Sequence, residues 1–372
     1  MISKVLITGG AGFIGSHLTE HLLAQGYCVR ILDALVPQVH GDSGRPPRYL
    51  SRDAEFIRGD IRDPEAVRRA LKRVDAVFHL AATVGVGQSM YQIRLYSDVN
   101  ALGTAVLLEA LAGHPVERLV VASSMSVYGE GLYRTSAGQT VQNAERSLAR
   151  LRSHEWDLYS DHEEKLVPVA TPETKIPTLS SVYALSKYYQ ERICLNVAQA
   201  YGIPCIGLRF FNVFGTRQSL SNPYTGVLAI FASRLLNNRP PIIHEDGLQR
   251  RDFVYIKDLV QACCLALSVS EVGGQVFNVG SGHASTILEV AEKLAVAVGK
   301  PNIEPQITGK YRTGDIRNCF ADISRARAIL GYKPCYGLEQ GLTELVEWLL
   351  TQSAEDRSSV AARELAERGL TV

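Results

Sequence analysis

The glycine spacing behind the first apolar run is the feature that most restricts the fold of this chain. In "KVLITGGAGFIGSHL", Gly9, Gly12 and Gly15 stand between a predicted strand at 4–8 and a predicted helix that begins near Phe13. Glycines at this spacing permit a tight turn, let the backbone approach a pyrophosphate, and let the helix pack closely on the strand. We therefore expect a dinucleotide site at this turn; a glycine-rich turn without a ligand is the alternative.

Short apolar runs alternate with helical periodicity over the first part of the chain. Because these runs are almost continuously apolar, we expect strands that are buried on both faces of a parallel sheet. The fold class predicted is α/β, a Rossmann-type doubly wound parallel sheet with a smaller C-terminal α/β lobe that binds substrate. One long helix is expected within 91–112, and the predicted strands are 4–8, 28–33, 55–60, 76–82, 118–124 and 205–210.

The predicted domain organisation follows the point where this alternation loosens, near Asn212. Residues 1–211 are expected to form the NAD-binding domain, with an irregular insertion at 131–180. Residues 212–351 are expected to form most of the second lobe, partly interwoven with the first. The charged tail 352–372 could be a terminal helix or partly frayed, and we assign it no chemistry.

Acidic side chains at the ends of the next two strands indicate which dinucleotide binds. Asp33 ends a strand about 20 residues after the glycines, where a carboxylate accepts both ribose hydroxyls and repels a 2′-phosphate. NAD is therefore favoured over NADP. Asp60 and Ile61 follow the third strand, where an adenine could lie, although an ordinary strand-to-helix turn with Asp63 as the helix cap is also plausible.

A tyrosine and a lysine at helical spacing form the second chemical motif. In "YALSK", Tyr183 and Lys187 lie one turn apart on the same face of a predicted helix. A phenol with a pKa near 10 acts as a base at neutral pH only where a cation stabilises its phenolate. Ser124, at the end of a buried strand, is a further candidate for the same site. The alternative is an aromatic and cationic pair on a helix surface.

Composition excludes several other classes of protein. The chain has 372 residues, 46% hydrophobic content and a net charge of +1, so it lacks the excess of positive charge that is typical of nucleic-acid-binding proteins. Neither an apolar run long enough to span a membrane nor a signal peptide is visible, which predicts a cytoplasmic protein without a membrane partner. The seven cysteines have no CxxC spacing and are expected to be reduced, and no metal is predicted.

Taken together, the motifs resemble those of the extended short-chain dehydrogenases/reductases, in the branch of NAD-dependent nucleotide-sugar epimerases and dehydratases. The resemblance spans about residues 3–350. The matching segments are "GGAGFIG" (9–15), Asp33, "GDIRD" (59–63), "HLAA" (79–82), Asn100, "SSMSVYGE" (123–130), "YALSK" (183–187), "RFFNVFG" (209–215), "RRDFVYIKDL" (250–259), "FNVGSG" (277–282) and "YRTGDIR" (311–317).

This resemblance implies a role for each matching position. Ser124, Tyr183 and Lys187 match the family's catalytic residues. The NAD site would comprise Gly9, Gly12, Phe13, Ile14, Gly15, Asp33, Asp60, Ile61, Leu80, Ala81, Ala82, Asn100, Tyr183 and Lys187, with Asn100 positioning the loop beneath the nicotinamide. The nucleotide-sugar substrate would meet Ser89, Ser124, Ser126, Asn212, Arg251 and Arg312, the last three at its diphosphate. An ion pair between Asp315 and Arg317 is also considered.

The residues beside Ser124 distinguish reactions within the family. Sugar 4,6-dehydratases carry Thr-Asp-Glu here, an acid and a base that expel water, whereas this chain has Ser124, Met125 and Ser126. Methionine and serine cannot act as that acid or base at neutral pH. The resemblance thus implies a 4-epimerase, an isomerase that forms a 4-keto sugar and returns the hydride to the opposite face.

Loop segments narrow the resemblance to bacterial dTDP-L-rhamnose 4-epimerases, which interconvert dTDP-L-rhamnose and dTDP-6-deoxy-L-talose. The insertion 131–180 has a similar length but lacks the cysteine pairs of many relatives, and His154 and His162 there are read as part of a solvated loop. Alternatives are a UDP-hexose or UDP-N-acetylhexosamine 4-epimerase, a nucleotide-sugar reductase, and a non-catalytic NAD-binding protein. Related enzymes pair helices equivalent to 91–112 and 182–201, so a homodimer is expected.

Overall fold

A parallel sheet of seven strands forms the centre of the protein in this computed structural model, which describes residues 2–270, 272–352 and 355–371. The strand order is β14-β9-β5-β4-β1-β2-β3, and every neighbouring pair is parallel. The strands are β1 (Lys4–Thr8), β2 (Cys28–Asp33), β3 (Glu55–Arg58), β4 (Ala76–His79), β5 (Arg118–Ser124), β9 (Cys205–Phe210) and β14 (Gln275–Val279).

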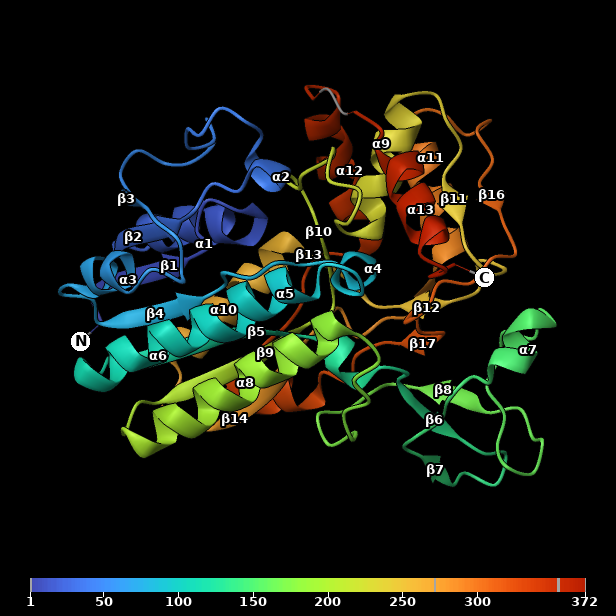
Figure 1. The fold of residues 1–372 in the computed structure, drawn as a ribbon, viewed down its shortest axis with the longest axis horizontal. Helices are drawn as coiled ribbons and strands as arrows, with labels where there is room; N and C mark the ends of the chain where they lie inside the picture. Colours follow the sequence, from blue (N-terminus) through green and yellow to red (C-terminus); the bar gives the residue numbers. More distant parts are fainter. Residues whose placement is uncertain (1, 271, 353–354, 372) are drawn as a thin grey trace.

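Helices cover both faces of this sheet (Figure 1). One face packs against α1 (Phe13–Ala24) and α10 (Ile256–Ser268), and the other packs against α3 (Pro64–Leu71), α6 (Gly103–Gly113) and α8 (Val182–Ala200). Adjacent residues of β1 show the division, because Val5 and Ile7 belong to the first core and Leu6 belongs to the second. The apolar runs are therefore buried on both sides, as a doubly wound sheet requires.

The long helix expected within 91–112 is present and runs without a break over 93–113, but its middle is wound more widely than an α-helix. The helix α5 (Ile93–Tyr96) leads into a π-helical segment (Ser97–Leu102) and then into α6. Such wide turns are rare and frequently lie at functional sites. Asn100 lies in the π-helical segment with its side chain fully buried.

The C-terminal half alternates between the two lobes. Strand β14 lies in the range predicted for the second lobe, yet it extends the main sheet beyond β9. The rest of the second lobe contains α9 (Val227–Leu236), α11 (Ile287–Ala297), α12 (Leu338–Leu349), a π-helical segment (Ala326–Leu330) and the short strands β10 (Asn212–Phe214), β11 (Ile242–Ile243), β12 (Arg250–Arg251), β13 (Phe253–Tyr255), β15 (Ser285–Thr286), β16 (Gln306–Ile307) and β17 (Asn318–Cys319). The last helix of the chain is α13 (Ser358–Glu367).

The insertion forms a small sheet that a buried ionic cluster joins to the second lobe. Arg146 lies 3.2 Å from Glu130 and also pairs with Glu245, and Arg317 lies 3.1 Å from Glu245. All four side chains are less than a tenth exposed, so the loss of one partner would leave a charge buried without compensation. The elements of the insertion are β6 (Leu132–Arg134), β7 (Thr140–Val141), α7 (Leu148–Arg152) and β8 (Val167–Val169).

Two further short helices, α2 (Pro37–His40) and α4 (Val86–Ser89), follow β2 and β4. Within the described ranges, no helix is long and apolar enough to cross a membrane. In the same residues, no group of three or more His, Cys, Asp or Glu side chains could hold a metal ion.

Two glycines of α6 provide a matched test of this packing. A Cβ at Gly103 would lie 2.5 Å from the Cγ2 methyl of Ile61, whereas a Cβ at Gly113 would meet nothing within 4 Å. We predict that Gly103→Ala lowers the free energy of unfolding by about 1–3 kcal/mol through overpacking. Gly113→Ala is the control and should be neutral or slightly stabilising. Urea unfolding of both variants checks this, and equal stabilities would contradict the close approach of α6 to Ile61.

Candidate active site

A cavity of about 1230 Å³ runs from the glycine-rich turn, along the carboxyl ends of the central strands, into the second lobe. Ligands of open parallel sheets bind at this edge. Asn100 and Ser89 do not line the cavity. Lining it are the other predicted positions, namely Gly9, Gly12, Phe13, Ile14, Gly15, Asp33, Asp60, Ile61, Leu80, Ala81, Ala82, Ser124, Ser126, Tyr183, Lys187, Asn212, Arg251 and Arg312.

The glycine-rich turn leaves no room for side chains where the strand, the turn and the helix meet. Gly9 has a φ of +72°, and a Cβ there would lie 2.9 Å from the backbone nitrogen of Ala81. A Cβ at Gly15 would lie 2.5 Å from the Cα of Gly10, whereas one at Gly12 would meet only the carbonyl of Gly9, at 3.3 Å. The turn therefore presents bare backbone to the cavity at the start of α1, which fits a pyrophosphate.

Asp33 ends β2 beside this turn and is held there by the backbone. Its carboxylate accepts hydrogen bonds from the nitrogens of Ala11, at 3.0 Å, and Leu35, at 2.9 Å. The side chain of His40 also approaches the carboxylate, at 3.6 Å, and burial lowers the pKa of this histidine. A neutral His40 leaves the carboxylate without a bound cation, which suits ribose hydroxyls and disfavours a phosphate.

At the end of the next strand, the carboxylate of Asp60 has a cationic partner. Both of its oxygens contact Arg62, at 2.9 and 2.7 Å, and this contact lowers the pKa of Asp60. Neighbouring Ile61 is buried against Gly103. Both residues line the cavity next to the glycine-rich turn, and Asp60 also holds Arg62 in place.

Ser124, Tyr183 and Lys187 meet where β5 and α8 face the cavity. The hydroxyl of Ser124 hydrogen-bonds the phenol of Tyr183, which partly offsets the increase that burial causes in the pKa of Tyr183. Burial lowers the pKa of Lys187 to about 8. Lys187 is buried and Tyr183 is partly exposed to the cavity, so an ammonium and a developing phenolate would interact more strongly here than in bulk water.

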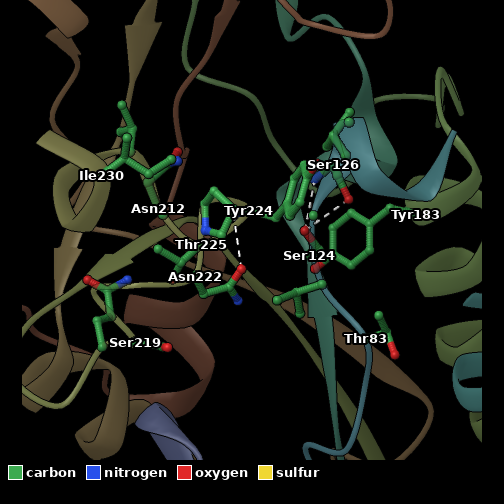
Figure 2. A pocket seen from close by; sticks show the side chains of 18 of the residues that line it. Thr83, Ser124, Ser126, Tyr183, Asn212, Ser219, Asn222, Tyr224, Thr225 and Ile230 are labelled. Atoms are coloured by element: carbon green, nitrogen blue, oxygen red, sulfur yellow. Dashed lines mark hydrogen bonds between the residues drawn. The ribbon is translucent and has the colours of Figure 1, made fainter. Parts of the chain in front are cut away.

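Ser126 extends this group of hydroxyls. Its Oγ donates to the Oγ of Ser124 at 2.9 Å, and its backbone nitrogen lies 3.2 Å from the same atom. Figure 2 shows Ser124, Ser126 and Tyr183 close together, with Asn212 across the cavity. This end of the cavity therefore offers several neutral hydrogen-bonding groups and no carboxylate beside Ser124.

A chain of buried hydrogen bonds lies behind Lys187. Its ammonium donates to the side-chain oxygen of Gln190, whose amide nitrogen lies 2.8 Å from His79 and 2.9 Å from Thr104. His79 in turn lies 2.8 Å from the hydroxyl of Thr8, the last residue of β1. Burial lowers the pKa of His79 to about 3, so it stays neutral beside Lys187. Helix α8 is thereby connected to the start of the glycine-rich turn.

The three residues expected at a diphosphate differ in how many hydrogen bonds their side chains already make within the protein. The side-chain oxygen of Asn212 is buried without a hydrogen-bond partner. Arg251 donates to the carbonyls of Arg250 and Arg317, at 2.9 and 3.0 Å, which fixes its guanidinium in place. Buried polar groups without partners are rare in folded proteins, so the Asn212 amide fits a site completed by a ligand.

The third of these residues, Arg312, forms a bidentate ion pair with Asp315, at 2.8 and 3.2 Å. The alternative in which Asp315 pairs with Arg317 is therefore wrong, because Arg317 instead contacts Glu245 and Asp246. Arg312 stays 40% exposed and retains donors toward the cavity.

Ser89 does not contact the cavity, and its predicted contact with substrate is corrected. Its side chain is fully buried, donates to the carbonyl of Val86 at 2.6 Å, and accepts from the backbone nitrogen of Tyr183 at 3.0 Å. Asn100 holds the backbone of Thr83 through bonds of 2.7 and 3.0 Å. Both side chains thus position the loop 83–90 beneath the cavity.

Several lining residues lie outside the recognised motifs. Gln38 and Asn222 line the cavity and form an amide cluster with the buried Gln88, with contacts of 3.0 and 3.1 Å that join α2, α4 and the loop 219–226. Tyr224 lines the cavity from the same loop. No periodicity or motif marks these residues, and only their convergence in the fold shows that the loop belongs to the site.

Comparison with known proteins agrees with this geometry. Residues 5–280 match the model of the family described as NAD dependent epimerase/dehydratase family. A similar curated protein is the dTDP-L-rhamnose 4-epimerase of Burkholderia thailandensis, 37% identical over 351 residues that cover 93% of this chain and 94% of that protein.

Solved structures are similar over almost the same range. UDP-glucose 4-epimerase of Thermotoga maritima, determined with UDP-glucose, has a TM-score of 0.76 and 32% identity, covering 94% of this chain and 99% of that one. The Thermus thermophilus enzyme in complex with NAD has a TM-score of 0.73 and 32% identity, covering 93% and 99%. The predicted fold, enzyme class and NAD cofactor are thus confirmed, and the chain belongs to the NAD-dependent epimerase/dehydratase family.

Proposed function

We propose that this nucleotide-sugar 4-epimerase converts dTDP-L-rhamnose to dTDP-6-deoxy-L-talose. The observation that carries the 4-epimerase assignment is the group of Ser124, Tyr183 and Lys187 on the cavity, with Met125 and Ser126 where a dehydratase has its acid and base. The choice of sugar is supported by the similarity to the Burkholderia enzyme. UDP-glucose is the second candidate substrate, because UDP-glucose 4-epimerases are similar over the same range.

Proton transfer is assigned to Tyr183. Its phenolate would accept the proton of the sugar 4-hydroxyl, while Ser124 donates a hydrogen bond to the same oxygen. The Lys187 ammonium lowers the energy of the phenolate, since charges interact strongly in a buried site. A bound NAD would supply reversible hydride transfer at C4, with a 4-keto sugar between the two transfers and no net oxidation.

Inversion of the configuration at C4 requires the nucleotide to stay bound while the sugar ring rotates and presents its opposite face. Asn212, Arg251 and Arg312 are assigned to the diphosphate, where amide and cationic donors suit its oxygens. The sugar would lie between Ser124 and the loop 83–90, where the hydroxyls of Ser124 and Ser126 can bond either face of the ring. Tyr183, now a phenol, gives its proton back when the second hydride transfer regenerates the alkoxide.

Turnover of a defined sugar tests this proposal. We predict that the protein with NAD converts dTDP-L-rhamnose into its C4 epimer, followed by NMR, with no lasting change in absorbance at 340 nm. Tyr183→Phe should lose about 100-fold or more of kcat because the proton acceptor is absent, while substrate binding is largely kept. Stoichiometric formation of NADH, or full activity of the variant, would contradict the mechanism. Turnover of UDP-glucose without turnover of dTDP-L-rhamnose would contradict the proposed substrate.

The hydrogen bond from Lys187 to Gln190 predicts a shift in the pH profile. In Gln190→Met the buried ammonium loses its acceptor, so the pKa of Lys187 should fall further. Because the charged lysine is then lost at lower pH, the decrease of kcat on the alkaline side should begin at lower pH. Gln199→Met, at an exposed position on the same helix, is the control. Identical profiles for all three proteins would show that Gln190 does not position Lys187.

We also propose a homodimer, while the cytoplasmic location stays a prediction. Leu102 and Leu185 are 52% and 51% exposed on the adjacent π-helical segment and α8, where a second copy would cover them. Leu102→Glu combined with Leu185→Glu should convert dimers into monomers in light scattering after size exclusion. Leu148→Glu, 48% exposed on the insertion, should not. A wild-type monomer would contradict the assignment.

A further inference from the structure

The C-terminal segment 355–371, to which we assigned no chemistry from the sequence, lies on the cavity. Helix α13 contributes Ser358, Ala361, Ala362, Leu365 and Ala366 to the cavity lining, and Thr371 follows them. Leu365 and Ala361 are less than a tenth exposed, which shows that the helix is packed against the rest of the protein. Its first residue, Ser358, accepts a hydrogen bond of 2.8 Å from Arg234 of α9, and Figure 1 shows α13 in the second lobe.

Helix α13 faces the loop that positions the catalytic tyrosine. A Cβ at Gly87 would lie 3.3 Å from both methyl groups of Leu365, so the helix rests directly on α4. The same short helix holds Tyr183, because Ser89 accepts the hydrogen bond from the Tyr183 backbone. The segment therefore covers the end of the cavity at which the sugar is expected to react.

A cluster of three oxygens fixes the middle of the segment. The carboxylate of Glu364 lies 2.7 Å from the hydroxyls of both Tyr91 and Tyr224, and these hydroxyls lie 2.6 Å apart. Tyr91 follows α4, and Tyr224 lies in the loop 219–226. Hydrogen bonds from the two tyrosines lower the pKa of Glu364, so its carboxylate is ionised at neutral pH and accepts both.

Two more contacts hold the ends of the segment. At its start, Asp356 lies 3.2 Å from Arg234 of α9, and both side chains are less than a tenth exposed. At its end, the carbonyl of Leu370 accepts a hydrogen bond of 2.9 Å from the nitrogen of Thr313, next to Arg312. The segment thus crosses from α9 to the residues assigned to the diphosphate and is held at three separate points.

The side chains that α13 turns toward the cavity are small and carry no charge. Its charged residues Arg363 and Glu367 are 71% and 64% exposed and approach each other at 3.8 Å. Among the described residues of 355–371, those that line the cavity include no cation, so a carboxylate on the sugar would find no charged partner there, whereas an alkyl group would meet Ala362, Leu365 and Ala366.

We propose that residues 355–371 form a wall of the sugar site, held by Glu364, Tyr91 and Tyr224, that selects an uncharged deoxy sugar and retains the 4-keto intermediate. This proposal rests on the function proposed above. Without the wall, the sugar loses apolar contacts and the keto sugar can leave before hydride returns, so that reduced cofactor accumulates. The nucleotide half of the substrate would keep its contacts with Asn212 and Arg251, which lie outside the segment, and would lose only the support that Leu370 and Thr371 give to the backbone at Arg312.

Binding and turnover of a tail-deleted protein test the wall. The variants are a chain that ends at Gln352, the point substitution Glu364→Ala, and the control Glu367→Ala on the exposed face of α13. Calorimetry on the Tyr183→Phe background, where turnover is blocked, should give an about tenfold higher Kd for dTDP-L-rhamnose after deletion and a clearly smaller increase in the Kd for dTDP. Glu364→Ala should show the same change to a smaller extent, and Glu367→Ala should show none.

In proteins with Tyr183 intact, deletion should raise KM and cause absorbance at 340 nm to increase during turnover. Equal Kd values for dTDP-L-rhamnose with and without the segment, together with no increase at 340 nm, would overturn the wall. If deletion prevents folding, the pair Glu364→Ala and Glu367→Ala decides the question by the same two measurements. Failure of the wild-type protein to epimerise this sugar would instead contradict the proposed function, whatever the Kd values show.

Discussion

The buried hydrogen bonds from Lys187 through Gln190 and His79 to Thr8 are the constraint on which the site depends. They connect the helix that carries the candidate proton acceptor with the strand that leads into the glycine-rich turn. The distance between the two halves of the site is therefore set inside the core, away from solvent. Because each member is buried, loss of one partner leaves another without a hydrogen bond, which makes the arrangement costly to distort.

The second lobe meets this fixed edge through contacts of a different kind. Ionic pairs of Arg146 and Arg317 with Glu245 and their neighbours join the insertion to the lobe, and the amide cluster of Gln38, Gln88 and Asn222 joins the lobe to the cofactor side. Polar contacts of this type depend on direction as well as distance, so they define one relative placement of the two sides. A cavity large enough for a dinucleotide and a nucleotide sugar is the consequence.

Local sequence patterns were sufficient to predict most strands of the central sheet, the glycine-rich turn and the location of Tyr183 and Lys187 on one helix, because each depends on residues close together in the chain. The place of strand β14 in the main sheet and the π-helical segment were not predicted, since pairing across the sheet and one widened helical turn leave no periodic signal. Ser89 was expected to contact the sugar. Its hydroxyl instead donates to the carbonyl of Val86 and accepts from the backbone nitrogen of Tyr183, so it fixes the start of α8. A terminal helix was one of two possibilities for the tail, but the place of α13 on the cavity was missed for a related reason: its contacts to Tyr91 and Tyr224 join residues far apart in sequence.

Oxidation and re-reduction by hydride transfer require that the hydrogen at C4 leaves and returns without exchanging with solvent. Epimerisation in heavy water tests this most directly, with the product examined by NMR and mass spectrometry. Hydride transfer within the closed cavity predicts a C4 epimer that contains no deuterium at C4. Deuterium at that carbon would show that C4 loses a proton to a base, and would contradict the assignment of Tyr183, Ser124 and Lys187 to oxidation and re-reduction.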